Sequence, residues 1–115
     1  MNKILVVEDD ETVYSGIKKL LEIQHYYVEV AQNGLKALEK IDYSFSLVIM
    51  DVMMPQLDGI ETGKAIREKD AQVEIVYATS SGQYMKEGYD VHALAYMLKP
   101  YMLEEVRETL VYYLK

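Results

Sequence analysis

Short apolar runs alternate along the chain with segments in which apolar residues recur every three or four positions. Nearly unbroken apolar runs of this length are typical of strands buried on both faces of a parallel sheet. The weaker alternation at residues 26–31 favours a strand at the edge of that sheet. The sequence therefore predicts strands at residues 3–7, 26–31, 45–50, 73–78 and 94–98.

Each predicted strand is followed by a segment for which the sequence predicts a helix. Apolar residues share one helical face over residues 13–21, Asn33 opens a second helix, and Asp58 is expected to cap a third. Residues 83–89 predict a short, weak helix, and residues 103–113 predict a final one. Five alternations of strand and helix specify an α/β fold of the (βα)5 type, a three-layer sandwich with helices on both faces of a parallel sheet.

The composition is that of a single acidic domain. The chain has 115 residues and a formal net charge of −7, and we expect one domain over residues 1–115. A negative surface repels nucleic-acid phosphates, so direct nucleic-acid binding by this chain is not expected. The chain has no cysteine, and no apolar run approaches the ~20 residues that span a bilayer. These features favour a soluble, cytoplasmic protein with no membrane contact.

Polar groups follow four of the five predicted strands. The carboxyl ends of parallel strands meet at one edge of a sheet, where α/β folds place their ligand sites. Each group also has an ordinary alternative role, since acids and hydroxyls cap helices or form turns and a terminal lysine is commonly solvated. The groups are Glu8, Asp9 and Asp10 after the first strand, Asp51 after the third, Thr79 after the fourth and Lys99 after the fifth.

Together these groups suit phosphoryl transfer to a carboxylate. Glu8, Asp9 and Asp51 offer the hard oxygen ligands that Mg²⁺ prefers. Asp51 is expected to face solvent at the end of the central strand, where it can act as the nucleophile that becomes an aspartyl phosphate. The hydroxyl of Thr79 and the ammonium of Lys99 can hold the other phosphoryl oxygens. The sequence thus predicts a Mg²⁺-dependent phosphoryl acceptor.

These residues lie in segments that resemble the receiver domain of two-component response regulators. The segments are ILVVED at residues 4–9, VIMDVMMPQLDG at 48–59, Thr79 after its apolar strand, and AYMLKP at 95–100. The resemblance covers the whole chain and implies the flavodoxin-like strand order 2-1-3-4-5. The segment GYDVHALAYMLKP at residues 88–100 and the short interval from Thr79 to Lys99 are most similar to receivers of LytTR-type transcription regulators.

The resemblance also implies a role for each site residue. Glu8 departs from the aspartate that is commoner in the family, an exchange that keeps the carboxylate. The implied roles are Asp51 as phosphoacceptor, Glu8, Asp9, Asp51 and the carbonyl of Met53 as ligands of Mg²⁺, Thr79 and Lys99 as phosphate contacts, and Thr79 with Tyr96 as the switch.

A receiver is a signalling switch and not an enzyme with a separate substrate. The resemblance implies that a sensor histidine kinase donates the phosphoryl group to Asp51, and that the chain catalyses only its own phosphorylation and dephosphorylation. The modified domain would remodel the surface of its fourth helix, last strand and last helix, favour a homodimer there, and control an output, transcription. The chain carries no output domain, so we expect a stand-alone receiver or the N-terminal part of a larger regulator.

Two other functions fit the same fold. One is a pseudo-receiver that docks to partners without phosphorylation. The other is a small flavodoxin-like cofactor-binding protein. The acids at residues 8–10 disfavour the second alternative, because they would repel a flavin phosphate where such sites use glycine, hydroxyls and backbone amides.

Overall fold

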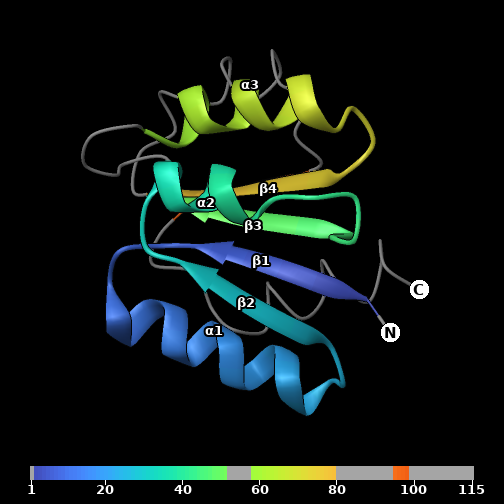
Figure 1. Ribbon diagram of the computed structural model, residues 1–115. Helices are drawn as coiled ribbons and strands as arrows, with labels where there is room; N and C mark the ends of the chain where they lie inside the picture. Colours follow the sequence, from blue (N-terminus) through green and yellow to red (C-terminus); the bar gives the residue numbers. More distant parts are fainter. Residues whose placement is uncertain (1, 52–57, 80–94, 99–115) are drawn as a thin grey trace.

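The computed structural model describes residues 2–51, 58–79 and 95–98, which form a parallel five-stranded sheet with helices on both faces (Figure 1). The strand order is β2-β1-β3-β4-β5, which confirms the predicted flavodoxin-like α/β fold. The predicted strands agree with the observed ones to within two residues at each end. The elements are β1 (Lys3–Val7), α1 (Glu11–Ile23), β2 (Tyr27–Ala31), α2 (Gly34–Lys40), β3 (Leu47–Asp51), α3 (Gly59–Lys69), β4 (Glu74–Thr79) and β5 (Ala95–Leu98).

Helix α1 covers one face of the sheet (Figure 1). Successive residues of a strand point to opposite faces, so alternate residues of β1 enter separate cores. Ile4 and Val6 of β1 pack with Ile17 and Leu21 of α1 in the core on this face. The helical spacing of apolar residues in α1 therefore results from packing against the sheet.

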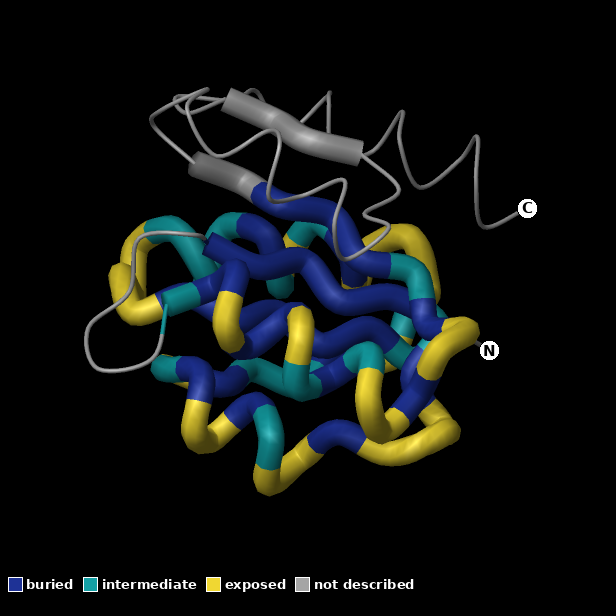
Figure 2. The backbone as a smooth tube through the Cα atoms, turned by 90° about the horizontal axis from the view of Figure 1, so that it is seen from above, coloured by how far each residue is buried: buried dark blue, intermediate teal, exposed yellow. Residues whose placement is uncertain are grey.

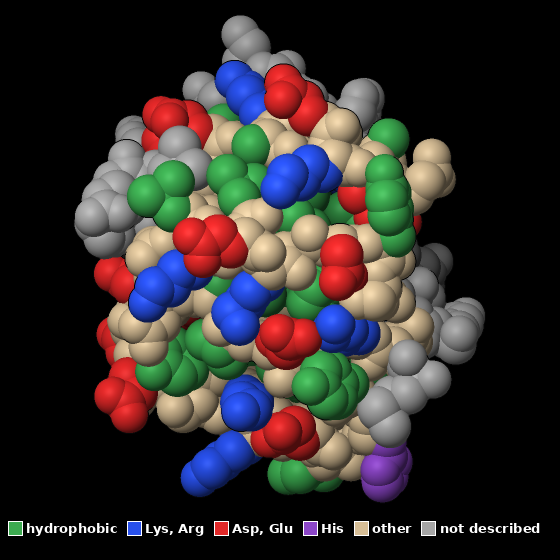
Figure 3. Space-filling model, in the orientation of Figure 1, with side chains coloured by type: hydrophobic (Ala, Val, Ile, Leu, Met, Phe, Trp, Pro, Cys, Tyr) green, Lys and Arg blue, Asp and Glu red, His purple; other side chains and the backbone are tan. Residues whose placement is uncertain are grey.

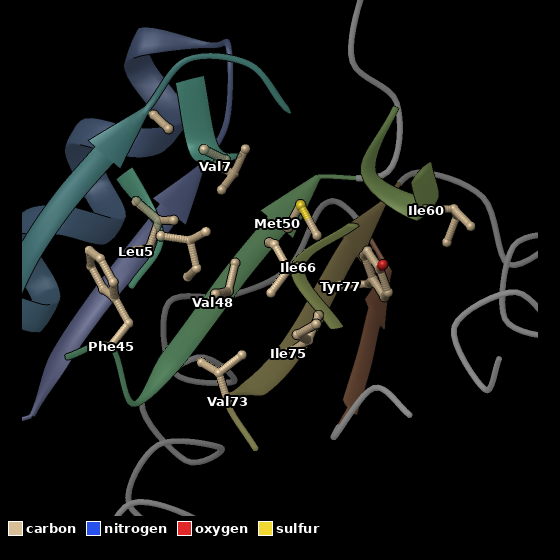
Figure 4. Packing of buried hydrophobic residues seen from close by; sticks show 13 residues of the cluster. Leu5, Val7, Phe45, Val48, Met50, Ile60, Ile66, Val73, Ile75 and Tyr77 are labelled. Atoms are coloured by element: carbon tan, nitrogen blue, oxygen red, sulfur yellow. The ribbon is translucent and has the colours of Figure 1, made fainter. Parts of the chain in front are cut away.

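Helices α2 and α3 cover the opposite face, where a second core lies (Figure 4). Figure 2 shows the buried residues concentrated in the strands and the exposed residues on the outer sides of the helices. Because both faces are covered, the inner strands carry unbroken apolar runs. The buried residues of the second core are Leu5, Val7, Ala31, Ala37, Ile41, Phe45, Val48, Met50, Ile60, Ile66, Val73, Ile75 and Tyr77.

Each described helix begins at a capping side chain. Asp10, Asn33 and Asp58 accept hydrogen bonds from backbone N–H groups in the first turns of α1, α2 and α3. The predicted start of a helix at Asn33 and the predicted cap at Asp58 are therefore confirmed. The two further helices predicted at residues 83–89 and 103–113 lie outside the described residues. In the described part of the chain, no helix is both long and apolar enough to cross a membrane.

A polar network joins β1 to its neighbours at the amino end of the sheet. Lys3 Nζ lies 3.1 Å from Glu29 Oε2 of β2 and donates a 2.9 Å hydrogen bond to Ser44 Oγ. It also lies 4.4 Å from the centre of the Phe45 ring, within cation–π range. The hydrogen bond to Glu29 raises the pKa of Lys3 above its ordinary value. Lys3 therefore stays protonated at neutral pH and links three segments of the chain.

The turn between α1 and β2 holds a residue in the left-handed backbone region. His25 has a φ of 69°. Its N–H donates to the carbonyl of Glu22 at 3.0 Å, and the N–H of Tyr26 donates to the carbonyl of Leu21 at 3.1 Å. This pattern is the Schellman motif, in which glycine is the usual residue at the position of His25. A side chain in this conformation costs on the order of 1 kcal/mol.

His25→Gly is therefore expected to raise the free energy of unfolding by about 0.5 to 1 kcal/mol, because relief of the backbone strain exceeds the extra entropy that glycine gives the unfolded chain. Urea denaturation measures the change. Gln24→Gly is the matched control, because Gln24 has a φ of −84° that suits any residue. This control is expected to lose stability, and an equal loss in His25→Gly would contradict the prediction.

Candidate functional site

The carboxyl ends of β1 and β3 bring two carboxylates together. Val7 of β1 pairs with Met50 of β3. Glu8 follows Val7 and Asp51 follows Met50, so the two acids leave neighbouring strands at the same level. The N–H of Glu8 donates a 3.0 Å hydrogen bond to the carbonyl of Ala31, which ends β2. This hydrogen bond to the end of β2 fixes the backbone of Glu8.

Glu8, Asp9 and Asp51 form a compact acidic cluster. One carboxylate oxygen from each residue lies within 4.8 Å of the other two. Glu8 is only 3% exposed and Asp51 only 7% exposed, whereas Asp9 is exposed. The expectation that Asp51 faces solvent was wrong, because Asp51 is the last residue of β3 and its neighbours cover it. Solvent reaches the cluster mainly on the side of Asp9.

The third acid of the first strand end has a different role. Asp10 Oδ1 accepts hydrogen bonds from the N–H groups of Thr12 at 2.9 Å and Val13 at 3.4 Å, which makes Asp10 the cap of α1. Its own N–H donates a 3.3 Å hydrogen bond to Glu8 Oε2. The ordinary alternative of helix capping therefore holds for Asp10, and only Glu8 and Asp9 join the acidic cluster.

The electrostatics of the cluster suit a divalent cation. Two unit negative charges ~5 Å apart repel by about 1 kcal/mol in water and about 3 kcal/mol at an effective dielectric of 20. A divalent cation between them offsets this repulsion. The three carboxylates offer only oxygen ligands, which Mg²⁺ prefers over thiolate or imidazole sites. The residues present therefore fit the predicted Mg²⁺.

The other predicted site residues fall at or beyond the described strand ends. Thr79 is the last residue of β4, and Asp51 of β3 pairs with Ala78 directly before it. Thr79 pairs with Leu98, the last residue of β5. The structure thus places the backbone of Thr79 beside the end of β3, as the sequence predicts. Tyr96 lies within β5, whereas Met53 and Lys99 lie outside the described residues.

One buried polar side chain near the site was missed by the sequence analysis. Tyr77 of β4 is fully buried, and its hydroxyl donates a 2.9 Å hydrogen bond to the carbonyl of Gly59, the first residue of α3. The apolar pattern of β4 assigns Tyr77 to the core without showing where its hydroxyl lies. Gly63 within α3 was the available signal, since glycine inside a helix often marks a close contact.

The fold and the acidic cluster define a doubly wound α/β domain with three carboxylates gathered at the carboxyl edge of its sheet. The response regulator receiver domain family matches residues 4–111. The chain therefore belongs to the family of response regulator receiver domains.

Individual relatives agree with this assignment. The chain is 40% identical over 103 residues to the transcriptional regulatory protein CpxR of Escherichia coli K12, a match that covers 88% of this chain and 44% of CpxR. This chain thus spans less than half the length of CpxR. The resemblance to LytTR-type receivers in particular is not supported, because CpxR is an OmpR-like regulator.

Two solved structures show the same architecture. The chemotaxis protein CheY4 of Vibrio cholerae superimposes with a TM-score of 0.88 at 32% identity, covering 97% of this chain and 98% of CheY4. The response regulator TrrA of Thermotoga maritima, in complex with Mg²⁺ and BeF, superimposes with a TM-score of 0.86 at 29% identity, covering 97% and 98% of the two chains.

Proposed function

We propose that this chain accepts a phosphoryl group on Asp51 from a sensor histidine kinase in a Mg²⁺-dependent reaction. The observation that carries the proposal is the acidic cluster. Asp51 is the last residue of the central strand β3, and one of its carboxylate oxygens lies within 4.8 Å of a carboxylate oxygen of Glu8 and of Asp9. Membership in the receiver family and the likeness to TrrA with bound Mg²⁺ and BeF support it.

The proposed transfer forms one bond and breaks one. An oxygen of the Asp51 carboxylate attacks the phosphorus, the bond from phosphorus to the kinase imidazole breaks, and the imidazole leaves with the bonding electron pair. Bound Mg²⁺ would supply charge that offsets the phosphoryl oxygens. Glu8, Asp9, Asp51 and the Met53 carbonyl would hold this ion, while the Thr79 hydroxyl and the Lys99 ammonium would hold the remaining oxygens.

The wider role follows from the family and from CpxR. We infer that the chain is a cytoplasmic receiver domain over residues 1–115 that controls transcription through a separate output domain. Its own chemistry would be confined to self-phosphorylation and self-dephosphorylation. Acidic and basic side chains are interspersed on the face seen in Figure 3, but acids are in excess and the net charge is −7. This charge disfavours direct contact of the chain with nucleic acid or anionic lipid.

The direct test is uptake of a phosphoryl group from acetyl phosphate, followed by intact mass spectrometry. One phosphoryl group is expected per chain when Mg²⁺ is present. Uptake is expected to fall sharply when EDTA removes the ion, since Mg²⁺ would offset negative charge on the acidic cluster and on the incoming phosphoryl group. A chain that stays unmodified with Mg²⁺ would favour the pseudo-receiver alternative.

Beryllofluoride, which mimics the phosphoryl group on aspartate, is expected to promote homodimer formation. The expected interface is the surface formed by the fourth helix, β5 and the last helix, with Thr79 and Tyr96 as the switch. Tyrosines at 84, 89, 96, 101 and 112 fall in this part of the sequence, and tyrosine is enriched at interfaces. Multi-angle light scattering measures the change. Asp51→Asn with beryllofluoride is the control, and an unchanged monomer mass in the wild type would contradict the prediction.

A further inference from the structure

Tyr77 connects three elements beside the acidic cluster. Figure 4 shows its ring on β4 between Met50 of β3 and Ile60 of α3. The side chain is 0% exposed, and the hydroxyl donates a 2.9 Å hydrogen bond to the carbonyl of Gly59. A carbonyl oxygen has two lone pairs, so Gly59 can accept this bond in addition to its helical one. The hydroxyl of Tyr77 thus reaches from the sheet to the first turn of α3.

Gly63 provides the space that this hydroxyl occupies. A Cβ atom on Gly63 would lie 2.0 Å from Tyr77 Oη, 3.2 Å from Tyr77 Cζ and 3.6 Å from Met50 Cε. The end of the phenol ring therefore lies directly against the backbone of α3 and next to the Met50 side chain. Only a residue without a side chain at position 63 permits this contact.

These contacts act at both ends of the segment that follows the phosphoacceptor. Met50 pairs with Tyr77 in the sheet and directly precedes Asp51. Gly59 directly follows Asp58, the cap of α3. The Tyr77 side chain thus holds the start of α3 at a defined distance from the end of β3. Tyr77 also lies two residues before Thr79, the last residue of β4.

We propose that the Tyr77 hydroxyl is a positioning group for the Mg²⁺ site. The proposal rests on the proposed function of the acidic cluster. When the hydroxyl is absent, the hydrogen bond between Tyr77 and Gly59 is lost, and the end of β3, which pairs with Tyr77 at Met50 and carries Asp51, is held less precisely. Metal and phosphoryl sites depend on such support, because displacements of about 1 Å reduce binding and rate. Tyr77 itself contacts neither the ion nor the phosphoryl group.

The test compares Mg²⁺ binding of wild type and Tyr77→Phe by titration, followed through backbone amide chemical shifts in NMR spectra. The variant keeps the ring and loses only the hydroxyl. Its dissociation constant for Mg²⁺ is expected to rise about three- to tenfold, the change that loss of one neutral hydrogen bond supports. The initial rate of phosphoryl uptake from acetyl phosphate at low Mg²⁺ is expected to fall by the same factor.

Two controls separate positioning from general stability. Ile66→Val removes one buried methyl group from the same helix and the same core, and it is expected to leave Mg²⁺ affinity unchanged. Gly63→Ala combined with Tyr77→Phe puts a methyl group into the space that the hydroxyl leaves. This double variant restores packing without the hydrogen bond and is expected to bind Mg²⁺ as weakly as Tyr77→Phe.

The outcomes are distinct. Weaker binding in both variants that lack the hydroxyl, with wild-type binding in Ile66→Val, would support the inference. Wild-type affinity in Tyr77→Phe, or recovered affinity in the double variant, would overturn the positioning role and leave the role of Asp51 intact. A wild-type protein that neither binds Mg²⁺ nor takes up a phosphoryl group would overturn both the proposed function and the inference.

Discussion

Asp51→Asn is expected to take up no phosphoryl group from acetyl phosphate in the presence of Mg²⁺. Intact mass spectra of this variant should therefore show no species with the added mass of a phosphoryl group. The amide is a poor nucleophile at neutral pH and carries no charge to hold a cation. The substitution is nearly isosteric, which matters because Asp51 is only 7% exposed at the end of β3. We therefore expect the fold to be kept.

The same variant should keep or gain stability. Removing one of three neighbouring negative charges relieves repulsion of about 1 to 3 kcal/mol in the absence of a cation. Circular dichroism and urea denaturation measure the fold and the free energy of unfolding. Unfolding of Asp51→Asn under conditions in which the wild type is folded would show that lost labelling reports lost structure.

Asp10→Asn is the matched control for this variant. It makes the same chemical change two residues from Glu8, and asparagine caps helices as well as aspartate. Since Asp10 caps α1 and does not belong to the acidic cluster, this control is expected to accept the phosphoryl group. Labelling of Asp51→Asn at the wild-type rate, or loss of labelling in both variants, would contradict the role of Asp51.

Gly63→Ala is expected to lower the free energy of unfolding by about 1 to 3 kcal/mol. The new methyl group would lie 2.0 Å from Tyr77 Oη, so the ring must move or α3 must shift away from the sheet. Either movement breaks the buried hydrogen bond to Gly59, which adds about 1 kcal/mol. The better helix propensity of alanine, worth up to ~1 kcal/mol, offsets only part of this loss.

Gly16→Ala provides the matched control in α1. Gly16 lies inside that helix, and a Cβ there would meet no atom within 4 Å. We expect the free energy of unfolding of this variant, measured by urea denaturation, to rise by about 0.5 to 1 kcal/mol, since alanine is the better helix former. An equal rise in the free energy of unfolding of Gly63→Ala and Gly16→Ala would show that the Tyr77 ring moves aside at no cost. It would contradict the tight contact between this ring and α3.

The sequence predicted the strands because each one obeys a local rule. Residues 4–7 are apolar throughout, since β1 is covered on both faces, and β2 has a weaker pattern, since it lies at the edge. The helix start at Asn33 and the cap at Asp58 were predictable for a similar reason, because a capping side chain bonds within its own first turn. Rules of this kind need only neighbouring residues.

Which of the acids form the cluster could not be read from the sequence. Glu8, Asp9 and Asp10 are consecutive carboxylates, and each could cap a helix or bind a cation. Their separation into two roles depends on where the chain turns into α1 and on the position of β3 beside β1. The burial of Asp51 was missed for the same reason, because the cover over a strand end comes from other elements.

The sequence by itself determined the order of strands and helices, the placement of carboxylates at two strand ends, and the motifs that the chain shares with receiver domains. These features depend on short segments of the sequence, because hydrophobic periodicity and residue type determine local structure over a few positions. Only the tertiary structure decided that Asp51 is buried and that Tyr77 meets Gly59 and Gly63. Tyr77 and Gly59 are 18 residues apart in the chain, and their contact exists only because α3 packs across β4.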